Sequence, residues 1–543
     1  MIRNCKGIFL GLVSLFFLSL VYAQKFPAAG DTLNFTSVCF TYPWHVNADQ
    51  YTLVVKDLKS NITTSTNGVG NKMVVNNLKP GHAYQWYVIS KKADGRVLHT
   101  SDSSHFYISA YSHPVRYRFV KNDLEHRTNS LIILDYAHSA INRDAEVVWY
   151  LPGIPDGANI RDLKMTDAGT FTYIKDSNAV EVDLLGNVLW KAPDNGVVSH
   201  MRRENYHHNL TRQSNGNYLV LGSEFKKFRV PAKNDSISVE MGTIIEYLPN
   251  GAVNWEWHST DFFKDEWIPF EFKNEKYTAM VHMNAVYSDG RYVYAGFRDM
   301  GWIVKIEKSS KKIVAIYGGK NSGLPYHYAQ GMFRFQHDAL PMKDGSFAVL
   351  NNDSVGDPKV VSSVILFSEG KTPGKKIFDF PLNYDGSTNG KSMKLGSVNE
   401  LPNGNLLVNM GAINRIFEVT RDKKVVWDVW VEKYDSFKKV WSFFPQYRVA
   451  SASSLYPNEF CVRIDKDTEK NGLYNCFLVN VGSEANAYRI MTERDGKLVE
   501  VFKTKTVVPQ KAITQKLHLP EYSRSITVEV VGKSKKELFV LPN

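Results

Sequence analysis

Residues 282–297, HMNAVYSDGRYVYAGF, read as a strand, a tight turn and a second strand. Asp289-Gly290 supplies the turn, because an Asp-Gly pair tolerates the positive φ angles of a two-residue hairpin loop. On both sides of the turn, side chains alternate in the period of two that is typical of a half-buried strand. The stretch therefore predicts a β-hairpin, and it sets the pattern for the sequence around it.

The same pattern recurs six times between about residues 115 and 445. Each unit has a turn, an alternating strand, a second strand that ends in an acidic or polar residue, and a third strand that carries an aromatic residue. Helical periodicity is almost absent, so we predict an all-β fold with a six-bladed β-propeller at 113–448, in which the aromatics pack between blades. The turns fall near Asn129, Gly169, Gly216, Gly290, Gly345 and Gly404, and the aromatics are Trp149, Trp190, Trp255, Tyr317, Phe378 and Trp427.

Short strands also fill the sequence on either side of the repeats. Residues 24–112 predict an N-terminal β-sandwich of the immunoglobulin or fibronectin III type, and the run LKPGHAYQW at 78–86 resembles the turn and strand of a fibronectin type III domain. Residues 449–543 predict a small C-terminal β-sandwich. Three folded regions fit the length, since a single core rarely grows beyond about 250–300 residues.

The first 23 residues have the pattern of an export signal. Arg3 and Lys6 precede an apolar run that ends in the small-residue cleavage pattern VYA, at Ala23. The run is shorter than the roughly 20 apolar residues of a membrane span. We therefore expect a periplasmic or secreted protein, cleaved near Ala23, with no stable membrane insertion.

Cysteine usage agrees with export. Cys461 and Cys476 flank a polar loop in a predicted hairpin, and in an oxidising compartment they are predicted to form a disulfide. Cys39 lies in an apolar strand and is expected to be a small buried hydrophobic residue.

The formal charge of +11 is spread along the chain. No run of Lys and Arg resembles a nucleic-acid-binding segment, so nucleic acid is not an expected partner. A basic surface can attract small anionic ligands.

Three histidines occupy the same place in three successive repeats. His208, His282 and His337 each lie eight residues before the turn glycine of their repeat. In a propeller, the strand before the first hairpin turn lines the central channel. The spacing therefore predicts that the three imidazoles meet at one mouth of this channel.

The other repeats have Arg161, Gly396 and, in a less clear alignment, Lys121 at this place. Arg298 lies eight residues after Gly290, at the far end of the following strand. The candidate site thus combines imidazoles with arginine.

Two chemistries can use three histidines. A His-only zinc site with an open position would make the protein a metal-dependent hydrolase or lactonase. Alternatively, one imidazole is a nucleophile while the others and an arginine hold a tetrahedral oxyanion. The nearby Arg298 disfavours the metal through charge repulsion, so we expect neither a metal nor a cofactor. A non-catalytic propeller that binds glycans or sulfate is a third alternative. The remaining histidines, including His207 and His258, lack this regularity and are expected to be surface or packing residues.

Three runs carry a family resemblance: HHNLTRQSNGNYLVL at 207–221, HMNAVYSDGRYVYAGFRDMGWIVKI at 282–306 and FQHDALPMKDGSFAVLNND at 335–353. They resemble the bacterial arylsulfate sulfotransferase family. The resemblance implies an exported, PAPS-independent enzyme on a six-bladed propeller with an N-terminal sandwich. Such an enzyme moves a sulfuryl group from a phenolic sulfate ester to a phenolic acceptor, in a ping-pong cycle through a sulfohistidine.

Residue by residue, the resemblance implies His337 as the nucleophile. His208, His282 and Arg298 would be catalytic residues that bind the sulfuryl oxygens, with Asn284 as a supporting donor in substrate binding. The expected partners are a small aryl sulfate donor and a phenolic acceptor, and a homodimer stays open.

Overall fold

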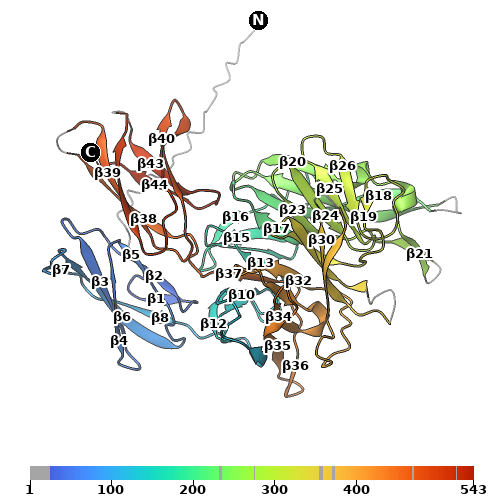
Figure 1. The fold of residues 1–543 in the computed structure, drawn as a ribbon, viewed down its shortest axis with the longest axis horizontal. Helices are drawn as coiled ribbons and strands as arrows, with labels where there is room; N and C mark the ends of the chain where they lie inside the picture. The colour runs from blue at the N-terminus through green and yellow to red at the C-terminus, as the bar shows by residue number, and fades with distance from the viewer. Residues whose placement is uncertain are drawn as a thin grey trace, which may run out of the picture.

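The computed structural model describes residues 25–230, 235–273, 276–353, 359–369, 373–467, 470–520 and 523–542. This part of the chain consists almost entirely of β-strands, arranged in three regions (Figure 1). The predicted export signal at 1–23 lies outside the described residues. Within them, no helix has the length and apolar character needed to cross a membrane.

The N-terminal region contains two sheets with a shared core. Phe40 on the smaller sheet packs edge-to-face against the buried Trp86 of the larger sheet, with ring centroids 5.0 Å apart. The larger sheet contains, in order, β1 (Asp31–Leu33), β8 (Ser104–Ile108), β6 (His82–Lys91), β3 (Gln50–Asp57) and β4 (Thr63–Gly68), with β7 (Val97–Thr100) paired to β6, and the smaller sheet contains β2 (Val38–Thr41) and β5 (Lys72–Val75).

The C-terminal region is likewise built from two sheets. Phe460 of one sheet contacts Tyr488 of the other, with centroids 5.4 Å apart, within one buried cluster. The sheets contain β38 (Phe460–Lys466), β39 (Leu473–Asn480) and β42 (Ala512–His518), and β41 (Lys497–Lys503), β40 (Tyr488–Arg494), β43 (Ser525–Val530) and β44 (Lys536–Val540).

The predicted disulfide between Cys461 and Cys476 is wrong, because both thiols are free. Cys461 lies opposite Val479, whereas Cys476 lies opposite Ile464, three positions along β38. Successive side chains of a strand point to opposite faces, so an offset of three places the two sulfurs on different faces of the sheet. Cys476 faces the C-terminal core, while Cys461 packs beside the buried Cys39 of the N-terminal region.

Between 115 and 452, the described residues form six sheets of four or more strands. The first three contain β37 (Val449–Ala452), β10 (Leu131–Leu134), β11 (Ser139–Ile141) and β12 (Val147–Tyr150); β13 (Ile160–Met165), β14 (Phe171–Lys175), β15 (Asn178–Val182) and β16 (Val188–Lys191); and β17 (Tyr206–Arg212), β18 (Tyr218–Arg229), β19 (Ser236–Tyr247) and β20 (Val253–His258). The next three contain β23 (Met283–Ser288), β24 (Tyr292–Phe297), β25 (Trp302–Glu307), β26 (Ile313–Tyr317) and β27 (His327–Tyr328); β28 (His337–Pro341), β29 (Ser346–Asn351), β30 (Ser363–Ser368) and β31 (Lys376–Pro381); and β32 (Ser397–Glu400), β33 (Leu406–Asn409), β34 (Arg415–Val419), β35 (Val425–Asp435) and β36 (Val440–Phe443), with β9 (Val115–Asn122) beside β35. Smaller elements are the hairpin of β21 (Phe270–Lys273) and β22 (Lys276–Ala279) and the 3₁₀ turns η1 (Ser259–Asp261), η2 (Asp265–Trp267) and η4 (Gly411–Ile413).

The first strands of these sheets contact one another in a fixed order: β37, β13, β17, β23, β28, β32 and β37 again. The aromatics of the repeats lie at the other side of each sheet and pack against the next sheet, as predicted. Trp149 stacks on Phe171 with centroids 3.8 Å apart, and Trp190 stacks on Tyr218 at 3.7 Å.

The first sheet takes its first strand from the far end of this region. β37 pairs antiparallel with β10, with Ala452 opposite Leu131. This strand lies just beyond 448, where the sequence placed the end of the propeller. Lys121 is not at the equivalent place, because it lies on β9 opposite Asp428. In the first sheet, the residues directly before β37 occupy the place that the sequence assigned to Lys121.

Candidate active site

The histidines lie where the first strands change register. Pairing with the neighbouring strand is irregular between Arg161 and Lys164 in β13, and directly after His337 in β28. In β17 the irregularity spans His208, and in β23 it lies between Met283 and Ala285, directly after His282; both histidines have positive φ angles. Such bulges redirect side chains beside active sites. Equal spacing in the sequence thus becomes a cluster of rings.

Tyr447, just before β37, lies at the centre of this cluster. Its ring centroid is 5.8 Å from that of His208 and 6.4 Å from that of His337, and His208 lies 4.7 Å from His282. The structure therefore brings together the three histidines that the spacing singled out. The Tyr447 hydroxyl is buried and has no hydrogen-bond partner in the described part of the chain. It is free to donate to a bound anion.

The hydrogen bonds of Asn352 fix the tautomer of His337. The Asn352 Nδ2 donates to the Ser392 carbonyl oxygen at 2.6 Å, so its Oδ1 is an acceptor. This Oδ1 lies 2.8 Å from the His337 Nδ1, which must carry a proton and donate it. The His337 Nε2 therefore keeps its lone pair. Burial lowers the pKa of His337 to about 3, so the ring is neutral at neutral pH.

Replacing Asn352 with alanine should lower kcat about 10–100-fold, the usual cost of losing a hydrogen bond that orients a functional imidazole. The free Nδ1 would no longer hold one tautomer. Nitrogen NMR of labelled His337 should show mixed Nδ1–H and Nε2–H forms, whereas a purely structural role would leave the tautomer unchanged. Asn351→Ala, next to it in the chain, is the control and should keep the single tautomer.

The segment 392–395 covers both His337 and Arg298. The Leu395 backbone N–H donates a hydrogen bond to the His337 Nε2 at 3.3 Å. Arg298 donates to the Met393 carbonyl oxygen at 3.1 Å and to Asp299 at 2.6 Å. A group bound to Nε2 would thus meet a backbone donor and a guanidinium.

The other rings of the cluster are neutral as well. Burial lowers the pKa of His282 to about 4, helped by the positive charge of Arg298. Burial and neighbouring rings also lower the pKa of His208 well below its usual range. The two Nδ1 atoms of His207 and His208 lie 2.6 Å apart, so one ring donates to the other. An anion placed among these rings would favour their protonated forms and raise their pKa values.

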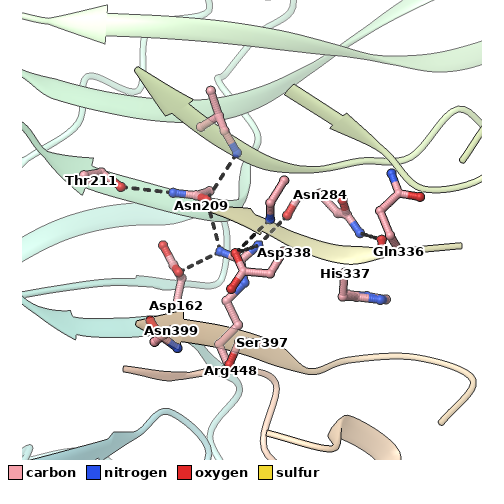
Figure 2. Close-up of polar contacts among 12 residues, drawn as sticks. Asp162, Asn209, Thr211, Asn284, Gln336, His337, Asp338, Ser397, Asn399 and Arg448 are labelled. Carbon is pink, nitrogen blue, oxygen red and sulfur yellow. Dashed lines mark hydrogen bonds and ion pairs between the residues drawn. The ribbon is translucent and has the colours of Figure 1, made fainter. Parts of the chain in front are cut away.

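Arg448 ties four first strands together (Figure 2). Its Nη1 donates to Asp162 at 2.9 Å and to the Asn209 Oδ1 at 3.0 Å. Its Nη2 donates to the Asn284 carbonyl oxygen at 2.6 Å and lies 3.8 Å from Asp338. All five residues are buried. This network holds the strands that carry the rings at fixed distances.

The predicted donor Asn284 has a different contact in the structure. Its Nδ2 donates to the Gln336 carbonyl oxygen at 2.9 Å, and its Oδ1 is buried without a partner (Figure 2). The contact fixes the backbone directly before His337. Asn284 is therefore placed to position the strand that carries His337.

A pocket of about 570 Å³ opens onto the cluster. Arg161, His208 and His282 line the pocket, whereas His337 does not, and residues of the second, third and fourth sheets supply its walls. Arg161 also lies over Tyr447, with 5.8 Å between the guanidinium carbon and the ring centroid. The pocket therefore leads from the surface to a group of donors and positive charge.

Sequence reasoning missed several of these residues. His207 was expected to be a surface or packing residue, yet it is buried against His208 and lines the pocket. The only indication in the sequence that His207 belongs to the site is its position directly before His208. The network around Arg448 did leave a signal, because a polar residue lies seven positions before the turn glycine in four repeats: Asp162, Asn209, Asp338 and Ser397.

Among the residues that the structure describes, no group of three or more His, Cys, Asp and Glu side chains is arranged to hold a metal ion. The expectation of a metal-free reaction stays a prediction.

Comparisons with known proteins relate the central part of the chain to one family. No curated protein matches the chain. Among solved structures, it is similar to a protein of unknown function from Bacteroides caccae (14% identity, 63% of this chain and 100% of that chain, TM-score 0.37), to AztD from Citrobacter koseri (12%, 75% and 99%, 0.32) and to virginiamycin B lyase from Staphylococcus aureus (11%, 57% and 88%, 0.31). Residues 135–353, which contain all three predicted histidines, match the family model Arylsulfotransferase (ASST). This central stretch of the chain is therefore similar to the arylsulfotransferase family.

Proposed function

We propose that the protein transfers a sulfuryl group from a phenolic sulfate ester to a phenolic acceptor, in a ping-pong cycle with sulfated His337 as the intermediate. One observation carries the proposal. Asn352 holds the proton of His337 on Nδ1, which leaves the Nε2 lone pair among donors and positive charge. A neutral imidazole with an unprotonated Nε2 is a nucleophile at neutral pH, and the sulfuryl donor would replace the hydrogen bond that this atom accepts from the Leu395 N–H.

We further propose that the six sheets are the blades of a closed six-bladed propeller. The support is the cyclic order of contacts among the first strands, which returns to β37. Arg448 and the pairing of β37 with β10 would close the ring. The rings would then lie at one mouth of the central channel.

In the first half-reaction, the His337 Nε2 attacks the sulfur of the donor. The N–S bond forms as the bond between sulfur and the aryl oxygen breaks, and the phenolate leaves with that electron pair. His208, His282 and Arg298 would stabilise the charge on the three equatorial oxygens, since sulfuryl transfer, like phosphoryl transfer, depends on positioning and electrostatics. The Tyr447 hydroxyl is a further donor.

In the second half-reaction, the oxygen of the acceptor phenol attacks the same sulfur. The new S–O bond forms, the N–S bond breaks and its electron pair returns to Nε2. The acceptor loses its proton and the donor phenolate gains one. A second histidine is suited to this proton transfer, because a bound anion raises its pKa toward neutrality.

An assay with 4-nitrophenyl sulfate tests this function. We expect release of 4-nitrophenol to depend on added phenol, with formation of phenyl sulfate and parallel double-reciprocal lines. Hydrolysis of 4-nitrophenyl sulfate at a rate that does not depend on phenol would contradict the proposal. The export pattern at 1–23 supports assaying the mature protein as a periplasmic or secreted enzyme.

Dialysis against EDTA should leave transfer activity unchanged. Arg298 and Arg161 place positive charge beside the histidines, and this charge repels a divalent cation. The measurement is the same assay before and after dialysis, with metal content checked in parallel. A loss of activity that zinc restores would instead favour a metal-dependent hydrolase.

A further inference from the structure

The pocket has an outer wall that the transfer chemistry does not use. Glu240 on β19 lines it, together with Phe225 on the paired strand β18. Glu240 is near enough to His282 to oppose the lowering of its pKa. A molecule bound in the pocket therefore has both His282 and this carboxylate among its lining residues.

A chain of hydrogen bonds leads across the pocket wall to Glu240. Ser177 donates to the Asn205 Oδ1 at 2.5 Å, and the Asn205 Nδ2 donates to the Ser223 Oγ at 3.3 Å. Ser223 then donates to the Glu240 Oε1 at 2.5 Å. Each donor of the chain is directed toward the carboxylate, so the wall presents an acceptor at its end.

The charge of Glu240 is not balanced by the protein. Among the described residues, the hydrogen bond to its Oε1 comes from the Ser223 hydroxyl, and no Lys, Arg or His forms an ion pair with it. Asp176 adds a second carboxylate to the pocket lining. The part of the pocket at the histidines suits an anion, whereas its outer wall repels one and attracts a cation.

Apolar surface lies beside the carboxylate. Phe225 is 55% exposed and Met280 is 59% exposed, and both line the pocket. An aromatic face next to a carboxylate is suited to an alkylammonium group, which gains both the ion pair and a cation–π contact.

We infer that this pocket selects phenolic acceptors that carry a cationic amine, with Glu240 as the specificity-determining residue. The inference rests on the proposed function. The phenol oxygen would face the sulfated His337, and the ammonium group would face the Glu240 carboxylate and the Phe225 ring.

Three acceptors of equal length test the inference: tyramine, with an ammonium group; 4-hydroxyphenethyl alcohol, which is neutral; and 4-hydroxyphenylacetate, which is anionic. With 4-nitrophenyl sulfate as the donor, we expect kcat/KM to fall in that order. The kcat/KM for tyramine should be about tenfold that for 4-hydroxyphenylacetate. Glu240 attracts the first acceptor and repels the second, and each of these partly exposed charge contacts contributes modestly. In Glu240→Gln, the ratio of these two values should fall toward one while the neutral acceptor keeps its rate.

Glu493→Gln, which makes the same charge change in the C-terminal region, is the matched control and should keep the wild-type ratio. A ratio near one in the wild type, or a ratio that Glu240→Gln leaves unchanged, would overturn the inference even when phenol is sulfated. If phenol itself is not sulfated, the proposed function fails, and this inference fails with it.

Discussion

Replacing His337 with asparagine should abolish sulfuryl transfer, with a loss of about 10⁴-fold or more, as expected when a covalent nucleophile is removed. The variant has no Nε2 lone pair, so neither half-reaction can form or break the N–S bond. The measurement is 4-nitrophenol release with and without phenol, after circular dichroism has shown that the fold is retained.

His138→Asn is a suitable control for this variant. His138 is also fully buried, and its positive φ angle is one that asparagine tolerates. It should retain most of the transfer activity. If His337→Asn still transfers at a rate near that of the wild type, the nucleophile is a different residue, and His282 is the next candidate.

Replacing Arg448 with methionine should give the largest loss of stability, about 3–5 kcal/mol, because removing one partner leaves buried charge uncompensated. Asp338 would lose its arginine, and Asp162 would keep only its ion pair with Lys164. The free energy of unfolding can be measured in urea by tryptophan fluorescence, since most of the 11 tryptophans lie in the central region.

The double variant Arg448→Met with Asp162→Asn separates charge from packing. It should recover part of the lost stability, because it removes one of the buried carboxylates that lost the Arg448 guanidinium. A single variant that loses less than about 1 kcal/mol would show that the network contributes little, as for an exposed ion pair.

The repeats of the sequence predicted the strands that follow each turn, because hairpin turns and alternating side chains are local features. β24, which follows Gly290, and β29, which follows Gly345, are examples. The stacking of Trp149 on Phe171 follows from the same repeat, since one large ring at a fixed place fills the space between adjacent sheets. The convergence of the three histidines could also be predicted from the sequence. Equally spaced residues stay equivalent in space when each strand has a bulge at a similar place.

What the sequence could not show depends on contacts between distant segments. Tyr447 and Arg448 enter the site because β37 pairs with β10, more than 300 residues earlier in the chain. No local pattern marks that pairing. The partner of His337 is similar, since Asn352 lies at the end of the next strand and only the structure shows where its amide points. The disulfide prediction failed for a simpler reason: proximity on adjacent strands does not ensure that two side chains share a face.

The most direct test of the central claim is the intact mass of the protein after mixing with 4-nitrophenyl sulfate alone. We expect a mass increase of one sulfuryl group, which peptide mapping should locate on His337 and which should be lost when phenol is added. No adduct in the wild type, together with intersecting double-reciprocal lines, would contradict the account and show direct transfer from donor to acceptor. An adduct that still forms in His337→Asn would contradict the choice of nucleophile.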